Sequence, residues 1–321
     1  MDLDAFVAEH DGEWRRLERL SRHRRLSATE ADELVALYQR AATHLSAVRS
    51  RSPDPVLVAR LSRLVLAGRG AITGGSRFRW RQVGRFFTAG FPLAAYRAWP
   101  WWSGVAAATI LLTGFLMSWI ATHPESARAF LTEEQMDRLV NTDFAGYYSE
   151  YLAPNFSFLV WTHNAWVLAM CLASGVLIAP VLYLLWENSL NLAIAGGVML
   201  ASGREDVFFG LILPHGLLEL TCMFVCAGVG LRIGWAWIAP GADRSRGRAV
   251  AQTGRTAMLV ALGLVPVLLV SALLEAFVTP SALPTAIRIG IGAAAWLAFL
   301  GYVLILGRRA AQAGHDADAD T

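Results

Sequence analysis

Long apolar runs in this 321-residue chain begin only after residue 100. Six of them lie at residues 101–121, 158–186, 191–202, 207–237, 258–278 and 289–306. About 20 consecutive apolar residues are enough for a helix to cross the hydrocarbon core of a bilayer. The pattern therefore predicts an all-α fold, a polytopic integral membrane helix bundle of about six spans. We assign residues 101–307 to this bundle.

The third and fourth apolar runs are less regular than the others. The run at 191–202 is short, and the sequence Pro214-His215-Gly216 interrupts the next run. Proline inside a helix removes a backbone hydrogen bond and bends or breaks the helix. A re-entrant pair within 190–238 is therefore an alternative to two full spans, and the sequence leaves both open.

The residues before the first span are polar, with apolar positions at helical intervals. Residues 1–75 predict a small helical cytoplasmic head, in which Ser27 and Glu30 form a capping box at the start of its second helix. Residues 76–100 alternate Arg with Phe and Trp. This pattern is typical of an interfacial helix, and equally of the positive flank of a first span. The acidic, polar N-terminus predicts no cleavable signal peptide.

Charge supports the membrane prediction and gives an orientation. Charged residues make up 17% of the chain, well below the quarter that is usual in soluble proteins. All 28 basic residues are Arg. With the N-terminus inside, 23 of them lie on the cytoplasmic side and 3 in outside loops, as the positive-inside rule requires. We therefore expect a bacterial inner membrane protein with both termini cytoplasmic and residues 308–321 as a disordered tail.

The predicted outer loop, residues 122–156, is acidic, with six Asp or Glu and two Arg. It is either a linker between two spans or a short amphipathic helix available to an extracytoplasmic partner. The net charge of +3 is too small, without a recognised motif, to predict nucleic-acid binding.

A few polar residues lie inside the predicted spans, where ionisable groups are costly and often functional. They are Asn164, Glu187, Asn188, Asn191, His215, Glu219 and Glu275. His215 and Glu219 are four residues apart and so share a helix face. By their predicted depth the set forms a polar track across the membrane. Three interpretations stay open: hydrogen bonds that fix the bundle, a proton or ion path, and a catalytic or metal site.

Small residues on the fourth span predict close packing. Gly228, Gly230 and Gly234 follow the polar residues, and the Gly230-x-x-x-Gly234 spacing allows helices to approach closely within the chain or in a homodimer. The cysteines, Cys222 and Cys226 among them, lie in apolar stretches and are read as buried apolar residues. We expect no cofactor and no metal, because no second His stands at ligand spacing from His215.

The segment with Pro214, His215, Gly216 and Glu219, followed by a glycine-rich stretch, resembles the stage II sporulation protein M (SpoIIM-like) family, in its non-sporulation branch. Other positions agree in order, namely Asn164, Asn188, Gly228 and the Glu275-Ala-Phe sequence. The chain departs from the family pattern at Asn188-Ser189, where the family often has Asn-Gly.

The resemblance implies a non-enzymatic membrane scaffold of the cell envelope, with protein partners such as cell-wall hydrolases or a MoxR-type ATPase system. The alternative is a transport or proton-conducting component similar to ABC-2-type permeases that uses His215, Glu219 and Glu275. That second likeness is one of fold only.

Overall fold

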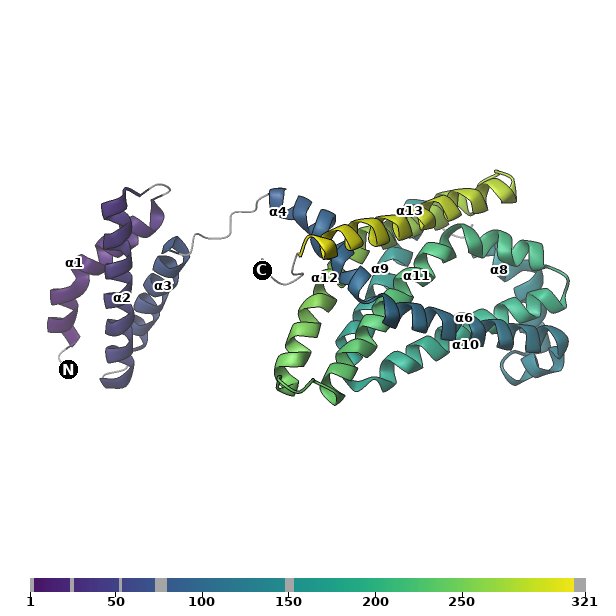
Figure 1. Ribbon diagram of the computed structural model, residues 1–321, viewed down its shortest axis with the longest axis horizontal. Helices are drawn as coiled ribbons and strands as arrows, with labels where there is room; N and C mark the ends of the chain where they lie inside the picture. The colour runs from purple at the N-terminus through teal and green to yellow at the C-terminus, as the bar shows by residue number, and fades with distance from the viewer. Residues whose placement is uncertain (1–2, 24–25, 52–53, 73–79, 148–152, 315–321) are drawn as a thin grey trace. The chain divides into compact units, whose positions relative to one another are not determined.

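The computed structural model describes residues 3–23, 26–51, 54–72, 80–147 and 153–314 (Figure 1). The chain divides into two compact units, Met1–Trp80 and Arg81–Thr321, which are described separately below.

The first unit is a bundle of three helices, α1 (Leu3–Arg22), α2 (Ala28–Arg51) and α3 (Pro55–Ile72). Each helix contributes one apolar stripe to a common core around Trp14, Leu34 and Leu61, all at most 2% exposed. The predicted capping box is present, since the Ser27 N–H donates to the Glu30 carboxylate (2.9 Å) and the Glu30 N–H to Ser27 Oγ (3.3 Å).

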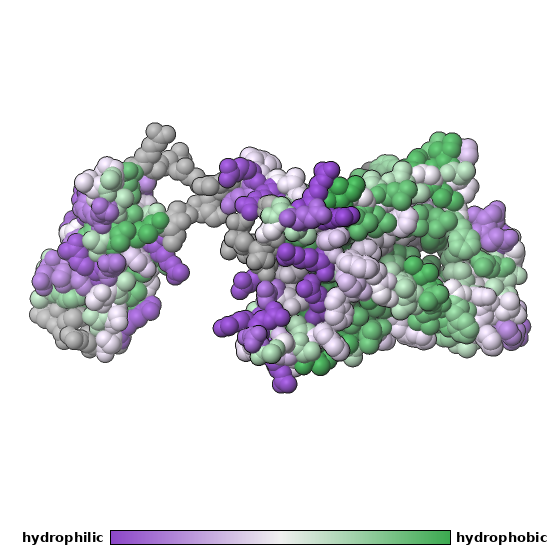
Figure 2. Space-filling view, viewed as in Figure 1, coloured by the Kyte–Doolittle hydropathy of each residue, from purple (hydrophilic) through white to green (hydrophobic). Residues whose placement is uncertain are grey.

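The second unit holds six helices that are long and apolar enough to cross a membrane, which confirms the predicted fold class. They are α6 (Trp99–Thr122), α9 (Ala153–Ala173), α10 (Ala179–Ala201), α11 (Glu205–Ile238), α12 (Arg246–Leu273), which the π-helical turn η5 (Leu274–Val278) prolongs, and α13 (Thr285–Gln312). Figure 2 shows hydrophobic side chains over the middle of this unit and hydrophilic ones towards its ends.

The second and third spans differ from the prediction. The predicted single span at 158–186 is two helices, because the chain turns in the 3-10 segment η4 (Gly175–Leu177) and at Ile178, whose φ is +60°. A Cβ on Gly175 would lie 2.5 Å from the Gly230 carbonyl oxygen, so the turn packs directly on α11. Gly175 to Ile178 are glycine and aliphatic residues, so the apolar run continues through the turn without a break in hydropathy. The short run at 191–202 is therefore the second half of a full-length helix, α10.

The fourth span is one continuous helix of 34 residues that passes through Pro214, and a re-entrant pair is therefore excluded. Helix α13 supports α11 at this point. A Cβ on Gly292 of α13 would lie 2.1 Å from the Pro214 carbonyl oxygen, so the two backbones are in direct contact.

The basic and aromatic segment ahead of the first span is helical in its described part. It forms α4 (Trp80–Arg85), the π-helical turn η1 (Phe86–Gly90) and α5 (Phe91–Arg97). In α5, Phe91, Leu93 and Ala94 are almost fully buried, and this helix packs against α12 and α13. Its apolar face thus covers other helices of the unit instead of lying on a lipid surface. Residues 76–79 lie outside the described part of the chain.

The predicted outer loop folds back onto the bundle. It contains η2 (Pro124–Ala129), α7 (Glu133–Arg138), η3 (Leu139–Asp143) and α8 (Phe144–Gly146). Ala127 packs with Ile120 of α6 and Val198 of α10 in a small buried cluster. At the other end of the chain, α13 runs to Gln312, so the prediction of disorder from residue 308 is wrong for 308–312. Residues 315–321 lie outside the described ranges.

Candidate functional site

Three ionisable side chains from two spans meet inside the bundle. His215 and Glu219 come from one face of α11, and Glu275 comes from η5. One ligand atom from each lies within 4.8 Å of the others, and His215 Nε2 is 4.0 Å from Glu275 Oε1. We call these three residues the polar cluster. A π-helical turn adds a residue to one turn of helix and so redirects its side chains, which brings Glu275 towards α11.

Hydroxyl groups of the fifth span hold His215 in place. His215 Nδ1 is 3.2 Å from Thr279 Oγ1, and Ser271 Oγ donates to the His215 carbonyl oxygen (3.2 Å). Ser271 and Thr279 are at most 1% exposed. Arg288 of α13 in turn donates to the Thr279 carbonyl oxygen. The hydrogen bonds around the polar cluster therefore connect α11 to the fifth span, and Thr279 connects that span in turn to α13.

Glu219 is only partly satisfied by hydrogen bonds. Its Oε2 is buried and has no hydrogen-bond partner among the described residues. Its polar neighbours are Asn164 of α9 and Ser271 of α12. A buried polar atom without a partner costs about 1–3 kcal/mol. Such an atom in a native structure calls for an explanation, and a functional role is one of them.

The outer loop adds Tyr147 to the surroundings of the polar cluster. Its pKa is raised to about 12 by partial burial and by the nearby carboxyl groups of Glu275 and Glu219. Its ring lies 5.2 Å from that of Phe156, edge to face. The loop therefore reaches the polar cluster from one end of the bundle.

Three residues of the predicted polar track lie elsewhere. Glu187, Asn188 and Asn191 belong to α10, which packs mainly against α6. Glu187 and Asn188 are half-buried and Asn191 is exposed. In the part of the chain that the structure describes, no hydrogen bond or ion pair links them to the polar cluster. Sequence reasoning placed Glu187 and Asn188 in a turn between the apolar runs at 158–186 and 191–202, whereas the turn lies at 174–178. The polar track stays a prediction for these three residues.

The predicted packing glycines lie at close helix contacts within the chain. A Cβ on Gly228 would be 2.6 Å from the Trp102 backbone of α6, and one on Gly230 would be 2.6 Å from the Cys171 carbonyl oxygen of α9. A Cβ on Gly234 would be 2.3 Å from Ile178. Gly216 differs from these three. It is buried beside His215, and its nearest contact is Ile212 of its own helix, at 3.1 Å.

Sequence reasoning did not single out Ser271, Thr279, Tyr147 or Arg288. A signal for the first two was present, because Ser271, Glu275 and Thr279 recur every four residues and so share one helix face. Nothing in the sequence placed Tyr147 near the polar cluster, because its position depends on how the outer loop folds.

The three cysteines agree with the sequence interpretation as small buried apolar residues, since Cys171, Cys222 and Cys226 are free and fully buried. One histidine and two carboxylates are nevertheless a donor set that divalent metals accept. Tetrahedral ligands about 2.1 Å from zinc lie roughly 3.4 Å apart, so the polar cluster would have to contract by about 1 Å to hold such an ion. Spacing along the sequence missed this set because Glu275 comes from another span.

The fold and the site define a multi-pass membrane protein with a polar cluster enclosed by its helices. The chain belongs to the stage II sporulation protein M family, whose model matches residues 107–280. This range includes the whole polar cluster and the packing glycines. Residues 4–74 match a domain of unknown function (DUF8413). Comparisons with curated proteins and with solved structures gave no match.

Proposed function

We propose that this protein is a non-enzymatic integral membrane scaffold of the bacterial cell envelope. The observation that carries the proposal is the enclosure of the polar cluster. His215 and Glu275 are each 5% exposed, and the hydrogen bonds to His215 come from a neighbouring span. Inter-helix hydrogen bonds of this kind fix the arrangement of spans. A scaffold needs such a fixed bundle, on which other proteins assemble.

The orientation is part of the proposal. The distribution of Arg, 23 to 3, favours cytoplasmic termini in the inner membrane. At the same end, Trp99, Trp235 and Trp237 are each about half exposed, as is usual for tryptophan at the membrane–water interface.

Two parts of the chain are candidate docking regions for partners. The first unit has its own core, so it can act as a separate binding module on the cytoplasmic side. The outer loop has exposed acidic residues, such as Glu133, Glu134 and Asp137, on the other side. The family resemblance implies cell-wall hydrolases or a MoxR-type ATPase as partner classes, and a second copy of the chain is a further candidate partner.

Purification of the protein in mild detergent after cross-linking in cells tests the scaffold proposal. We expect partner proteins to purify with the intact chain, and cytoplasmic partners to be lost when residues 1–72 are removed. Neutral substitution of the three loop acids should release outer partners only. A monomer without partners in all these preparations would contradict the proposal.

A second candidate, a proton or cation site, rests on two observations in the polar cluster. Glu219 Oε2 has no partner among the described residues, and the three ligand atoms lie within 4.8 Å of one another. Ion flux into liposomes that contain the purified protein should then depend on Glu219, whereas a scaffold gives equal flux for wild type and Glu219→Gln. Elemental analysis of the wild type and His215→Ala distinguishes a bound metal from a proton site.

A further inference from the structure

Two histidines and a glutamate from two helices of the first unit lie close together. His10 and Glu13 are three residues apart on α1, which places them on one face of that helix, and His44 belongs to α2. One ligand atom of each residue lies within 4.8 Å of the others, and all three side chains are half-buried. We call these three residues the His–Glu cluster.

The two imidazole rings of the His–Glu cluster are stacked. Their centroids are 4.1 Å apart, and the ring of Phe6 meets both of them edge-on, at 4.6 Å from His10 and 5.3 Å from His44. Burial and the neighbouring His10 lower the pKa of His44 below its ordinary value of 6.5. The His44 ring is therefore neutral near pH 7, which is the form that binds metal ions.

Glu13 supplies a carboxylate to the His–Glu cluster. Arg40 Nη1 donates to Glu13 Oε1 at 2.7 Å, and in the described part of the chain no hydrogen bond involves Glu13 Oε2. Carboxylates that bind metal ions are commonly held in this way by a hydrogen bond to one oxygen atom. Two imidazoles and one carboxylate are the ligand set of zinc sites that keep a fourth position for water.

The ligands of the His–Glu cluster have to move slightly before they meet one ion. Tetrahedral zinc requires ligand atoms roughly 3.4 Å apart, and the two rings are inclined by only 28°. One ring must therefore turn about its side-chain bonds, and His10 is the better placed to do so. Its side chain is 21% exposed, and its ion pair with Glu9 is long, at 3.9 Å.

Trp14 connects the His–Glu cluster to the core of the first unit. Its Nε1–H donates to His44 Nδ1 at 3.2 Å, so Nε2 carries the proton of the neutral ring. A metal ion either takes the lone pair of Nδ1 or binds Nε2 after the proton has moved to Nδ1. The hydrogen bond from Trp14 is lost in both cases, which should lower the affinity for the ion by about fivefold.

We propose that the His–Glu cluster binds one divalent transition-metal ion, such as zinc, and that this ion links α1 to α2. Imidazole ligands favour such ions over magnesium and calcium, which prefer sets of oxygen atoms. The sequence expectation of no metal considered only the spacing around His215, and the two histidines of this site come from different helices. The proposal does not depend on the scaffold function.

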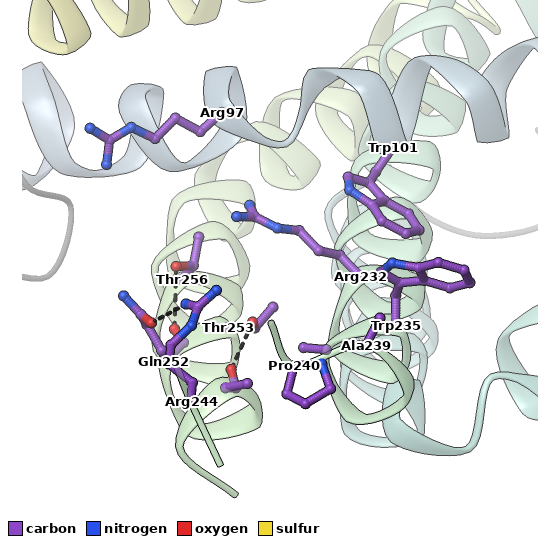
Figure 3. Close-up of a pocket in the computed structure, with 12 residues that line it drawn as sticks. Arg97, Trp101, Arg232, Trp235, Ala239, Pro240, Arg244, Gln252, Thr253 and Thr256 are labelled. Atoms are coloured by element: carbon purple, nitrogen blue, oxygen red, sulfur yellow. Dashed lines mark hydrogen bonds between the residues drawn. The ribbon is translucent and has the colours of Figure 1, made fainter. Parts of the chain in front are cut away.

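A pocket of about 280 Å³ in the second unit offers no set of ligands for such an ion (Figure 3). Arg97, Arg232 and Arg244 line it together with Trp101 and Trp235, and its described lining residues include no histidine, cysteine or carboxylate. The polar cluster is the other group of three such ligands in the part of the chain that the structure describes. A test of the proposal must therefore distinguish the His–Glu cluster from the polar cluster.

Calorimetric titration of the intact protein in detergent, after a chelator has removed bound metal, tests the site with zinc and magnesium as separate probes. Loss of an outer partner of a metal ligand already costs 10–100-fold in affinity, so loss of a ligand in His44→Gln should weaken zinc binding by about 100-fold. The glutamine oxygen can still accept the hydrogen bond from Trp14. His23→Gln is the matched control, since His23 is exposed beyond the end of α1 and lies outside the His–Glu cluster.

The carboxylate has its own pair of variants. Glu13→Gln removes the charged ligand and should also weaken zinc binding strongly. Glu9→Gln removes an exposed acidic side chain from the same helix, outside the His–Glu cluster, and should leave zinc binding nearly unchanged.

Hydrogen exchange of the same samples locates the ion. Zinc at 100 times its Kd should slow the exchange of amides in α1 and α2 by about 100-fold, where exchange requires opening of the first unit. His44→Gln should abolish this protection. If His44→Gln unfolds the first unit, His10→Gln replaces it, since among the described residues no side-chain hydrogen bond involves His10.

Four results would overturn the proposal. Equal zinc affinity in the wild type and in His44→Gln, or its replacement His10→Gln, would exclude these histidines as ligands. Protection by zinc in the second unit only would assign the ion to the polar cluster. Equal losses in Glu13→Gln and Glu9→Gln would indicate general attraction of a cation to acidic residues. Magnesium binding as tight as that of zinc would remove any role for imidazole.

Discussion

Gly228→Ala should loosen the contact between α6 and α11. A Cβ at this position would lie 2.6 Å from the backbone N and Cα of Trp102 and 2.9 Å from the backbone carbonyl carbon of Trp101. All of these are main-chain atoms, so no side chain can rotate away to make room. The added methyl group must therefore push the two helices apart by several tenths of an ångström.

The size of the effect follows from two opposing terms. Replacing Gly by Ala in a helix interior gains about 1 kcal/mol through lower backbone entropy of the unfolded state. Overpacking costs about 1–3 kcal/mol, and we expect the upper end of that range because backbone atoms lie on both sides. Gly228→Ala should thus destabilise the protein by roughly 1–2 kcal/mol. Gly114→Ala on α6, where nothing lies within 4 Å, should be neutral or stabilising.

Thermal unfolding of the three proteins in the same detergent measures the difference. For a unit of this size, 1 kcal/mol corresponds to about 2–4 °C in Tm, so we expect Gly228→Ala to melt several degrees below Gly114→Ala. Equal melting temperatures for the two variants would show that α6 and α11 do not approach each other as closely as described here.

Three further predictions concern other parts of the chain. Thr279→Val removes the hydrogen bond between Thr279 Oγ1 and His215 Nδ1 and should lower the free energy of unfolding by about 1 kcal/mol, because a buried hydrogen bond is lost. Burial and the neighbouring His10 lower the pKa of His44 below its ordinary value of 6.5, so the unfolded state takes up protons first. The free energy of unfolding of the first unit should therefore be highest above pH 6.5 and should decrease as the pH falls below 6.5. Hydrogen exchange of the amides in α1 and α2 measures this decrease, and His44→Gln should make it smaller. The buried Cys222 and Cys226 should react with maleimide only after unfolding.

The fold class could be predicted from the sequence because it depends on the number of apolar runs. The boundaries of the spans could not all be predicted. The break at Gly175 to Ile178 contains only glycine and aliphatic residues. The flanking Ser174 and Pro180 are too few to interrupt the apolar run, so hydropathy does not show the break. The close approach of Gly230 to this turn, which depends on tertiary packing, fixes the reversal of the chain.

The candidate site shows the same division between local and tertiary signals. His215 and Glu219 could be paired from their spacing, because helix geometry alone puts them on one face. Their meeting with Glu275 depends on how α11 packs against the fifth span. The sequence also placed Glu187 directly after a span that ends at residue 186, whereas Glu187 lies inside α10, which begins at Ala179. Its position along the span depends on where α10 begins, and hydropathy does not show that point.

The glycine contacts of α11 restrict how its polar residues His215 and Glu219 can move. Its second half is in backbone contact with α6 through Gly228 and with the end of α9 through Gly230, and its first half carries His215 and Glu219. A transporter that exposes these residues alternately to each side would have to move α11 relative to its neighbours. Such a movement breaks the glycine contacts and the hydrogen bond from Ser271 to the His215 carbonyl oxygen together. A helix held along its whole length therefore favours a fixed bundle, and with it the scaffold, over alternating access.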